Sequence, residues 1–129
     1  MIVDTSAIMA VLLREPDAER FELALEAAYR RAISTATYIE LVNVIDRRVG
    51  GNLVHVAETL MTAAKIDLVP FTVEQAQWAR HARLTYGVGR HRAKLNFGDC
   101  FAYALAKATG EPLLFKGDDF AYTDIASAI

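Results

Sequence analysis

The feature that most constrains the fold of this chain is the alternation of short apolar runs with longer segments of helical periodicity. The apolar runs predict strands near residues 1–3, 32–35, 67–71 and 112–115. The periodic segments predict helices near residues 7–13, 17–28, 37–48, 54–65, 72–86 and 99–109. The last of these helices is apolar nearly all round, so we expect it to be buried. Strands that alternate with helices predict a three-layer α/β domain with a small, mostly parallel sheet of about four or five strands.

Length and composition indicate one globular domain spanning residues 1–129. Hydrophobic residues make up 53% of the 129 residues, which is enough for a sizeable core. The formal net charge of −2 identifies no class of partner. No apolar run approaches the roughly 18 residues of a membrane span, and no secretory leader pattern is present. With Cys100 as the only cysteine, we expect a cytoplasmic protein without membrane association.

Acidic residues stand at the points where such a fold forms a ligand crevice. Asp4 follows the first apolar run, and Asp118 and Asp119 follow the last. Glu40 and Asp99 fall in the first turns of two apolar helices. These positions meet at the carboxyl edge of a parallel sheet. Because gathered carboxylates repel one another, the pattern favours a hard divalent cation such as Mg²⁺ or Mn²⁺ that keeps them ionised together.

Each acidic residue also has a purely local interpretation. Thr37 and Glu40 match a capping box, in which Glu40 bonds its own helix start. Asp99 is a typical first-turn residue, because a carboxylate there is favoured by the unpaired N–H groups. Asp4 and residues 118–119 are typical of turns after strands. Spacing alone leaves both interpretations open.

Other kinds of site have little support in the sequence. The histidines His55, His81 and His91 are scattered, and with one cysteine they form no zinc pattern. No nucleophile-elbow motif indicates a serine hydrolase. Residues 87–89 form a Gly-Val-Gly turn, but no strand precedes it as a dinucleotide motif requires.

Four segments carry the acidic residues in a recognisable order. They are Met1-Ile2-Val3-Asp4-Thr5-Ser6-Ala7, Tyr38-Ile39-Glu40-Leu41, Leu95-Asn96-Phe97-Gly98-Asp99-Cys100 and Leu113-Leu114-Phe115-Lys116-Gly117-Asp118-Asp119-Phe120. In order and spacing, over the whole chain, they resemble the motifs of PIN-domain ribonucleases, and most of all the VapC toxins of bacterial VapBC toxin–antitoxin pairs. The resemblance implies a PIN-like fold.

The resemblance also implies roles for individual residues. The acidic quartet of the family falls on Asp4, Glu40, Asp99 and Asp119 as catalytic residues. We expect Asp4 and Asp99 to ligate the metal directly and the other two to hold its waters. Ser6 matches the hydroxyl beside the first aspartate and is given a supporting role.

The last motif departs from the commoner family pattern. Phe115 and Gly117 stand where a threonine and an aspartate are usual. The departure favours Asp119 as the fourth acid, with Asp118 as its alternative. It also leaves open whether a second metal is held.

The function implied by the resemblance is that of a toxin. It comprises Mg²⁺-dependent endoribonuclease activity that cuts tRNA or rRNA with a metal-activated water and inhibits translation. It also comprises dimerisation, for which we expect contacts from helix 37–48 or its neighbour, and neutralisation by a VapB-like antitoxin. One alternative is a phosphoryl-transfer enzyme with an aspartate nucleophile, which would need a second aspartate where Ser6 stands. The other is a non-catalytic RNA-binding PIN-like domain.

A basic stretch separates two of the acidic motifs. Residues 75–98 contain no acid, although they hold five of the 14 lysines and arginines: Arg80, Arg83, Arg90, Arg92 and Lys94. A positive surface near an acidic metal site suits a polyanionic substrate, so these five are candidate RNA-binding residues. A solvated helix face and loop is an equally ordinary interpretation.

Overall fold

The computed structural model describes residues 1–129 and contains a four-stranded sheet in the order β3-β2-β1-β4. Its strands are β1 (Ile2–Val3), β2 (Arg31–Ser34), β3 (Ile66–Val69) and β4 (Leu113–Leu114). All neighbouring strands are parallel, and Ile2 of β1 pairs with Ala32 on one side and Leu113 on the other. The prediction of an α/β fold with a small parallel sheet is confirmed.

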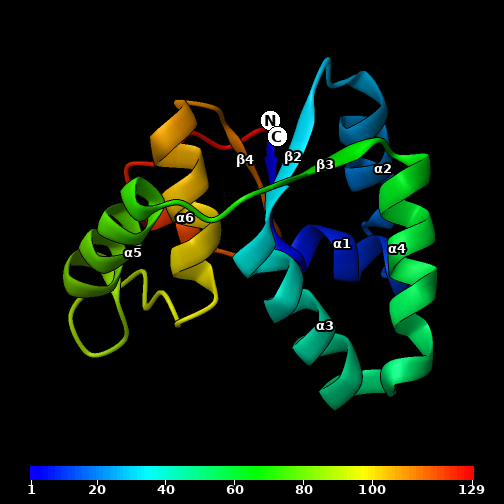
Figure 1. Ribbon diagram of the computed structural model, residues 1–129, viewed down its shortest axis with the longest axis horizontal. Coiled ribbons are helices and arrows are strands. Elements are labelled where there is room, and N and C mark those ends of the chain that lie inside the picture. The colour runs from blue at the N-terminus through cyan, green and yellow to red at the C-terminus, as the bar shows by residue number, and fades with distance from the viewer.

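Six α-helices surround the sheet. They are α1 (Thr5–Leu12), α2 (Ala18–Ala27), α3 (Thr35–Val49), α4 (Val54–Ala63), α5 (Val73–Tyr86) and α6 (Asp99–Thr109), with 3-10 turns η1 (Gly51–Leu53) and η2 (Phe120–Tyr122). In Figure 1, α5 and α6 lie on one side of the sheet, and α1, α2 and α4 lie on the other. α3 runs away from the carboxyl end of β2 between these two groups. No helix is both long enough and apolar enough to cross a membrane.

The core consists of two hydrophobic clusters, one on each face of the sheet. Successive residues of β1 and β4 alternate between them: Ile2 and Leu113 join the α6 side, whereas Val3 and Leu114 join the α1 side. A strand that buries both faces must be apolar at every position, which explains the short continuous runs in the sequence. Helix α6 is buried as expected, and Gly110 ends it in the left-handed conformation.

The start of α3 differs from the prediction. The helix begins at Thr35, because the hydroxyl of Ser34 accepts hydrogen bonds from the N–H groups of Ala36 (3.0 Å) and Thr37 (3.4 Å). The predicted capping box of Thr37 and Glu40 is therefore wrong. Because Ser34 caps the helix, the side chain of Glu40 is free to form contacts outside its own helix.

Candidate active site

Asp4 lies at the carboxyl end of β1, where the chain turns into α1. Its Oδ2 accepts hydrogen bonds from the backbone N–H (2.9 Å) and the hydroxyl (2.6 Å) of Ser6. Asp4 therefore caps α1, which begins at Thr5 and not at residue 7 as predicted. The residue is only 5% exposed, and burial raises the pKa of its carboxyl even though the bonds from Ser6 oppose this.

Ser6 connects Asp4 to the segment after β4. Its hydroxyl also accepts a hydrogen bond from the backbone N–H of Lys116, at 2.9 Å. The Lys116 ammonium lies 2.5 Å from both Glu15 and Asp17, and these two carboxylates neutralise it. The lysine next to Ser6 is thus already paired with two carboxylates. Ser6 itself bonds both Asp4 and the segment after β4, so it is placed to support Asp4.

Glu40 approaches the same place from the second turn of α3. Its Oε2 accepts a hydrogen bond from the hydroxyl of Thr5, and burial raises the pKa of its carboxyl. Gly98 packs directly beneath it, because a Cβ at this position would stand 2.6 Å from Cγ of Glu40. The loop before α6 can approach α3 this closely only with glycine at position 98.

Asp99 is the first residue of α6. Its Oδ2 accepts a hydrogen bond from the N–H of Asn96 (2.7 Å), and its own N–H donates to Oδ1 of Asn96 (3.0 Å). The two residues thus hold the turn 96–99 reciprocally, in a manner similar to a capping box. Burial, and next the negative charge of Asp4, raise the pKa of Asp99 from 3.8 to about 7.

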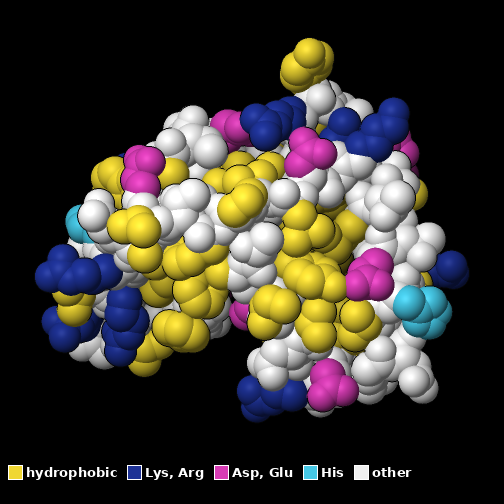
Figure 2. Space-filling view, in the orientation of Figure 1, with side chains coloured by type: hydrophobic (Ala, Val, Ile, Leu, Met, Phe, Trp, Pro, Cys, Tyr) yellow, Lys and Arg dark blue, Asp and Glu magenta, His cyan; other side chains and the backbone are white.

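One cavity of about 220 Å³ brings the predicted acidic residues together. Its lining is Asp4, Thr5, Ser6, Met9, Glu40, Val44, Arg48, Asn96, Asp99, Lys116, Asp119 and Phe120. Asp119 lines this cavity, whereas Asp118 does not. Figure 2 looks onto the notch between α3 and the α5–α6 layer, at the base of which an acidic side chain is visible. The quartet that the sequence motifs name is therefore gathered from four distant segments.

The four acidic side chains of this cavity have no ion-pair partner. None of Asp4, Glu40, Asp99 and Asp119 forms an ion pair with a lysine, arginine or histidine. Instead the charge of Asp119 raises the pKa of both Asp4 and Asp99. Carboxylates that are gathered without a paired cation repel one another, and a hard cation stabilises them together.

The donor set indicates which cation the cavity fits. It contains no histidine or cysteine, so it lacks the ligands of a zinc site. No three Asp, Glu, His or Cys side chains lie close enough together to hold one ion by themselves. Mg²⁺ commonly takes one or two carboxylates and keeps several waters, and that arrangement fits two direct ligands with the other acids behind water.

Seven of the twelve lining residues were not predicted as part of the site, among them Thr5, Asn96 and Arg48. Thr5 donates a hydrogen bond to Glu40, and Asn96 holds the turn that carries Asp99. Arg48 is exposed, forms no ion pair and lies two helical turns after Glu40. The spacing 40–44–48 places Glu40, Val44 and Arg48 on one face of α3, and this signal was available in the sequence.

The five candidate RNA-binding residues lie outside the acidic cavity. Arg80 and Arg83 are on α5, and Arg90, Arg92 and Lys94 follow in the loop before α6. All five are exposed. Figure 2 shows dark-blue side chains gathered at the lower left, over the end of α5 and this loop. Their role in binding RNA stays a prediction.

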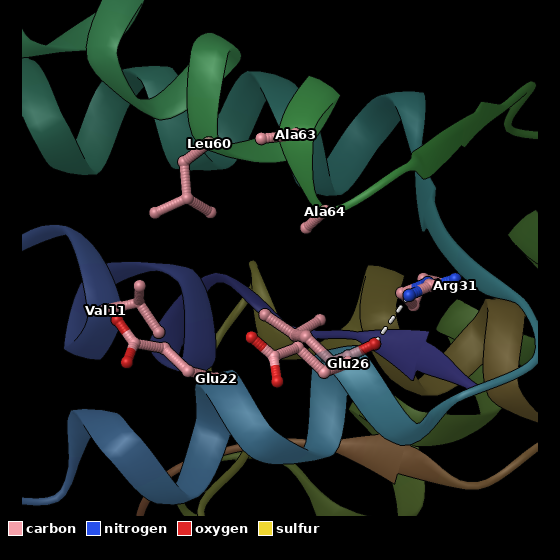
Figure 3. A pocket seen from close by; sticks show the side chains of 8 residues that line it. Val11, Glu22, Glu26, Arg31, Leu60, Ala63 and Ala64 are labelled. Carbon is pink, nitrogen blue, oxygen red and sulfur yellow. Dashed lines mark hydrogen bonds between the residues drawn. The ribbon is translucent and has the colours of Figure 1, made fainter.

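A separate apolar cavity of about 340 Å³ lies between α2, α4 and β2. Figure 3 shows Leu60 and Ala63 on α4 facing Glu22 and Glu26 on α2, with Arg31 at one end. Arg31 donates a hydrogen bond to the carbonyl of Leu25 at 2.6 Å. None of the predicted catalytic residues lines this cavity. It lies on the same side of the sheet as α1, away from α5 and α6.

Comparisons with known proteins agree with this geometry. Residues 1–126 match the model of the PIN domain family. Ribonuclease VapC30 of Mycobacterium tuberculosis is 54% identical over 127 residues, which cover 98% of this chain and 97% of the relative. The crystal structure of M. tuberculosis VapC20, described as a sarcin-ricin loop cleaving toxin, has a TM-score of 0.77 at 16% identity, covering 97% of this chain and 95% of that chain. A toxin-antitoxin complex from Klebsiella pneumoniae gives a TM-score of 0.67 at 21% identity, covering 99% and 97%. The chain therefore belongs to the PIN-domain family and, within it, to the VapC ribonucleases.

Proposed function

We propose that this protein is a Mg²⁺-dependent endoribonuclease and the toxin of a type II toxin–antitoxin pair. It would cut phosphodiester bonds of tRNA or rRNA and so inhibit translation, with Mn²⁺ able to replace Mg²⁺. The observation that carries the proposal is the convergence of four carboxylates on one cavity without a paired cation. Membership of the VapC ribonucleases supports the same reaction class.

The residues of the cavity divide the work. A divalent cation would supply Lewis-acid chemistry, neutralising charge on the phosphoryl oxygens and lowering the pKa of the attacking water. Asp4 and Asp99 are its proposed ligands. Glu40 keeps Oε1 free while Thr5 occupies Oε2, and its raised pKa suits it to accept the proton of that water at Oε1. Asp119 would hold and orient a water of the cation.

The substrate needs a cation as well as carboxylates. Arg48 is the one lining cation of the cavity that no carboxylate neutralises. A guanidinium binds phosphate oxygens with two parallel hydrogen bonds. We therefore assign Arg48 to a phosphate of the bound RNA.

The proposal is tested by cleavage and by metal binding. Purified protein should cleave RNA with Mg²⁺ and stop when EDTA is added. In calorimetry the double variant Asp4→Asn, Asp99→Asn should lose Mn²⁺ binding that the wild type shows. Equal Mn²⁺ affinity for the two proteins would refute the assigned ligands. RNA binding without cleavage would favour a non-catalytic domain, and a trapped aspartyl-phosphate would favour an aspartate nucleophile.

A VapB-like antitoxin is the proposed protein partner. The fold likeness to a chain of a toxin-antitoxin complex from Klebsiella pneumoniae supports such a partner. Because the cavity has unpaired carboxylates, we expect the antitoxin to insert an arginine or lysine there. A structure of the complex with no basic side chain near Asp4 or Asp99 would contradict this expectation.

A further inference from the structure

A second cavity lies behind the turn that carries Asp99. Within this turn, Asn96 and Asp99 line the acidic cavity, whereas Phe97 and Cys100 line the second one, which has a volume of about 310 Å³. Its remaining lining residues are Phe71, Ala76, Ala79, Arg80, Arg83 and Phe101. The turn is therefore a thin wall between an acidic cavity and an aromatic one.

Phe97 is exposed in a fixed position. It exposes 75% of its surface, and its ring forms an edge-to-face pair with Phe101, with the centroids 4.9 Å apart. The backbone on both sides is held by the reciprocal hydrogen bonds of Asn96 and Asp99 and by the packing of Gly98 against Glu40. A large aromatic ring that a rigid turn keeps exposed to solvent is typical of a binding surface.

The edge of the aromatic cavity is cationic. Arg80 and Arg83 stand three residues apart on α5, and neither pairs with a carboxylate. Residues 75–98 contain no acidic side chain that could do so. Recognition of single-stranded RNA combines aromatic rings for the bases with cations for the backbone. An apolar face of a second protein chain would leave the charges of Arg80 and Arg83 without a partner.

We propose that the aromatic cavity binds a base of the RNA next to the scissile phosphate, with Phe97 as the stacking surface and Arg80 against the sugar–phosphate backbone. The inference rests on the proposed function, since it requires the phosphate to lie in the acidic cavity. The common wall makes the two positions adjacent. Stacking accepts any base, so this cavity contributes affinity and holds the neighbouring phosphate at Asp99, and it does not read base identity.

Fluorescence anisotropy with two labelled probes tests the inference. One probe is a short oligouridylate and the other is an abasic ribose-phosphate chain of the same length, both measured in EDTA at low salt so that nothing is cleaved. The wild type should bind the oligouridylate more tightly. Phe97→Ala should weaken this binding about five- to a hundred-fold and leave the abasic probe unaffected, and Phe97→Trp should restore it.

Two further variants separate base stacking from other effects. Arg80→Ala should weaken both probes to a similar extent and reduce the salt dependence of binding. Tyr29→Ala removes a fully exposed aromatic ring between α2 and β2 and should change neither affinity. Equal losses on both probes for Phe97→Ala, or no loss, would overturn the inference.

Measurements on the same samples distinguish this inference from the function beneath it. A wild type that cleaves RNA with Mg²⁺ but does not prefer the oligouridylate overturns the base site alone. A wild type that fails to cleave any RNA overturns the proposed function. If light scattering shows that Phe97→Ala turns a dimer into a monomer, Phe97 belongs to an interface between two copies and the base site is refuted.

Discussion

At the scale of single residues, the acidic side chains serve local structure and the site at once. Asp4 caps α1, where only a turn after a strand was predicted, and Asp99 closes the first turn of α6, as its local interpretation predicted. Both carboxylates also face the common cavity. A cap engages one or two lone pairs of a carboxylate, which leaves the others for a further partner. The two interpretations that the sequence left open are therefore compatible for these residues.

Asp99→Asn separates the two roles. An amide oxygen can still accept the bond from Asn96, so the turn should persist. The raised pKa of about 7 means that the folded protein keeps a proton that the unfolded chain, near 3.8, has released. The free energy of unfolding of the metal-free wild type should therefore decrease as pH rises from about 4 to 7. In Asp99→Asn this decrease should be smaller.

Thermal unfolding in EDTA across this pH range gives the measurement, together with RNA cleavage in Mg²⁺ on the same preparation. We expect the variant to melt several degrees above the wild type at neutral pH and to have no detectable cleavage. Near-normal cleavage by the variant would show that Asp99 has only a local structural role.

Gly98→Ala tests the close approach of the loop to α3. Gly98 has ordinary helical angles (φ −65°, ψ −42°), so the backbone tolerates alanine and only the side chain of Glu40 obstructs it. In the wild type, Gly98→Ala should displace Glu40 and lower both stability and cleavage. In a Glu40→Ala background, the same change should stabilise the protein by about 0.4–1 kcal/mol, measured by urea unfolding. Equal effects in both backgrounds would contradict the contact.

At the scale of elements, helix α3 shows what sequence patterns can and cannot predict. Its apolar face and its position after a strand were predictable from periodicity. Its first turn was not, because Ser34, Thr35 and Thr37 can all cap a helix and only the end of β2 selects Ser34. The bond from Thr5 to Glu40 joins segments 35 residues apart, so no local pattern reveals it. The sequence motifs identified the four acidic residues, whereas the contacts that hold them together are visible only in the structure.

Arg48→Ala tests the far end of the functional face of α3. Loss of a phosphate contact should raise KM for RNA by about ten-fold, the usual worth of a hydrogen bond to a charged group, with little change in Tm. Arg47 is a matched control, because it is the neighbouring exposed arginine and does not line the acidic cavity. Cleavage kinetics that respond equally to Arg47→Ala and Arg48→Ala would remove Arg48 from the site.

At the scale of the whole molecule, we expect the protein to be a homodimer with contacts from α3 or its neighbour α4. Exposed apolar side chains on these helices are consistent with this: Ile39 and Val49 on α3, and Val56 on α4. Light scattering at micromolar concentration without antitoxin should report twice the chain mass of 14.2 kDa. Ile39→Glu should then shift the protein toward monomer. A wild-type monomer under these conditions would contradict the prediction.

The attachment of the segment after β4 has a consequence for inactivation. Asp119 reaches the cavity from a segment that is tied to the body by the bond from Lys116 to Ser6, by the ion pairs of Lys116, by the bonds from Tyr103 and Lys107 to Asp124, and by the buried ring of Phe120. Phe120 is the one buried residue of this segment, so local opening would leave the rest of both hydrophobic clusters intact. The enzyme would then lose one wall of its cavity with its circular dichroism spectrum nearly unchanged. Mild heat or a protease acting on this segment should therefore abolish cleavage before any spectroscopic probe detects unfolding.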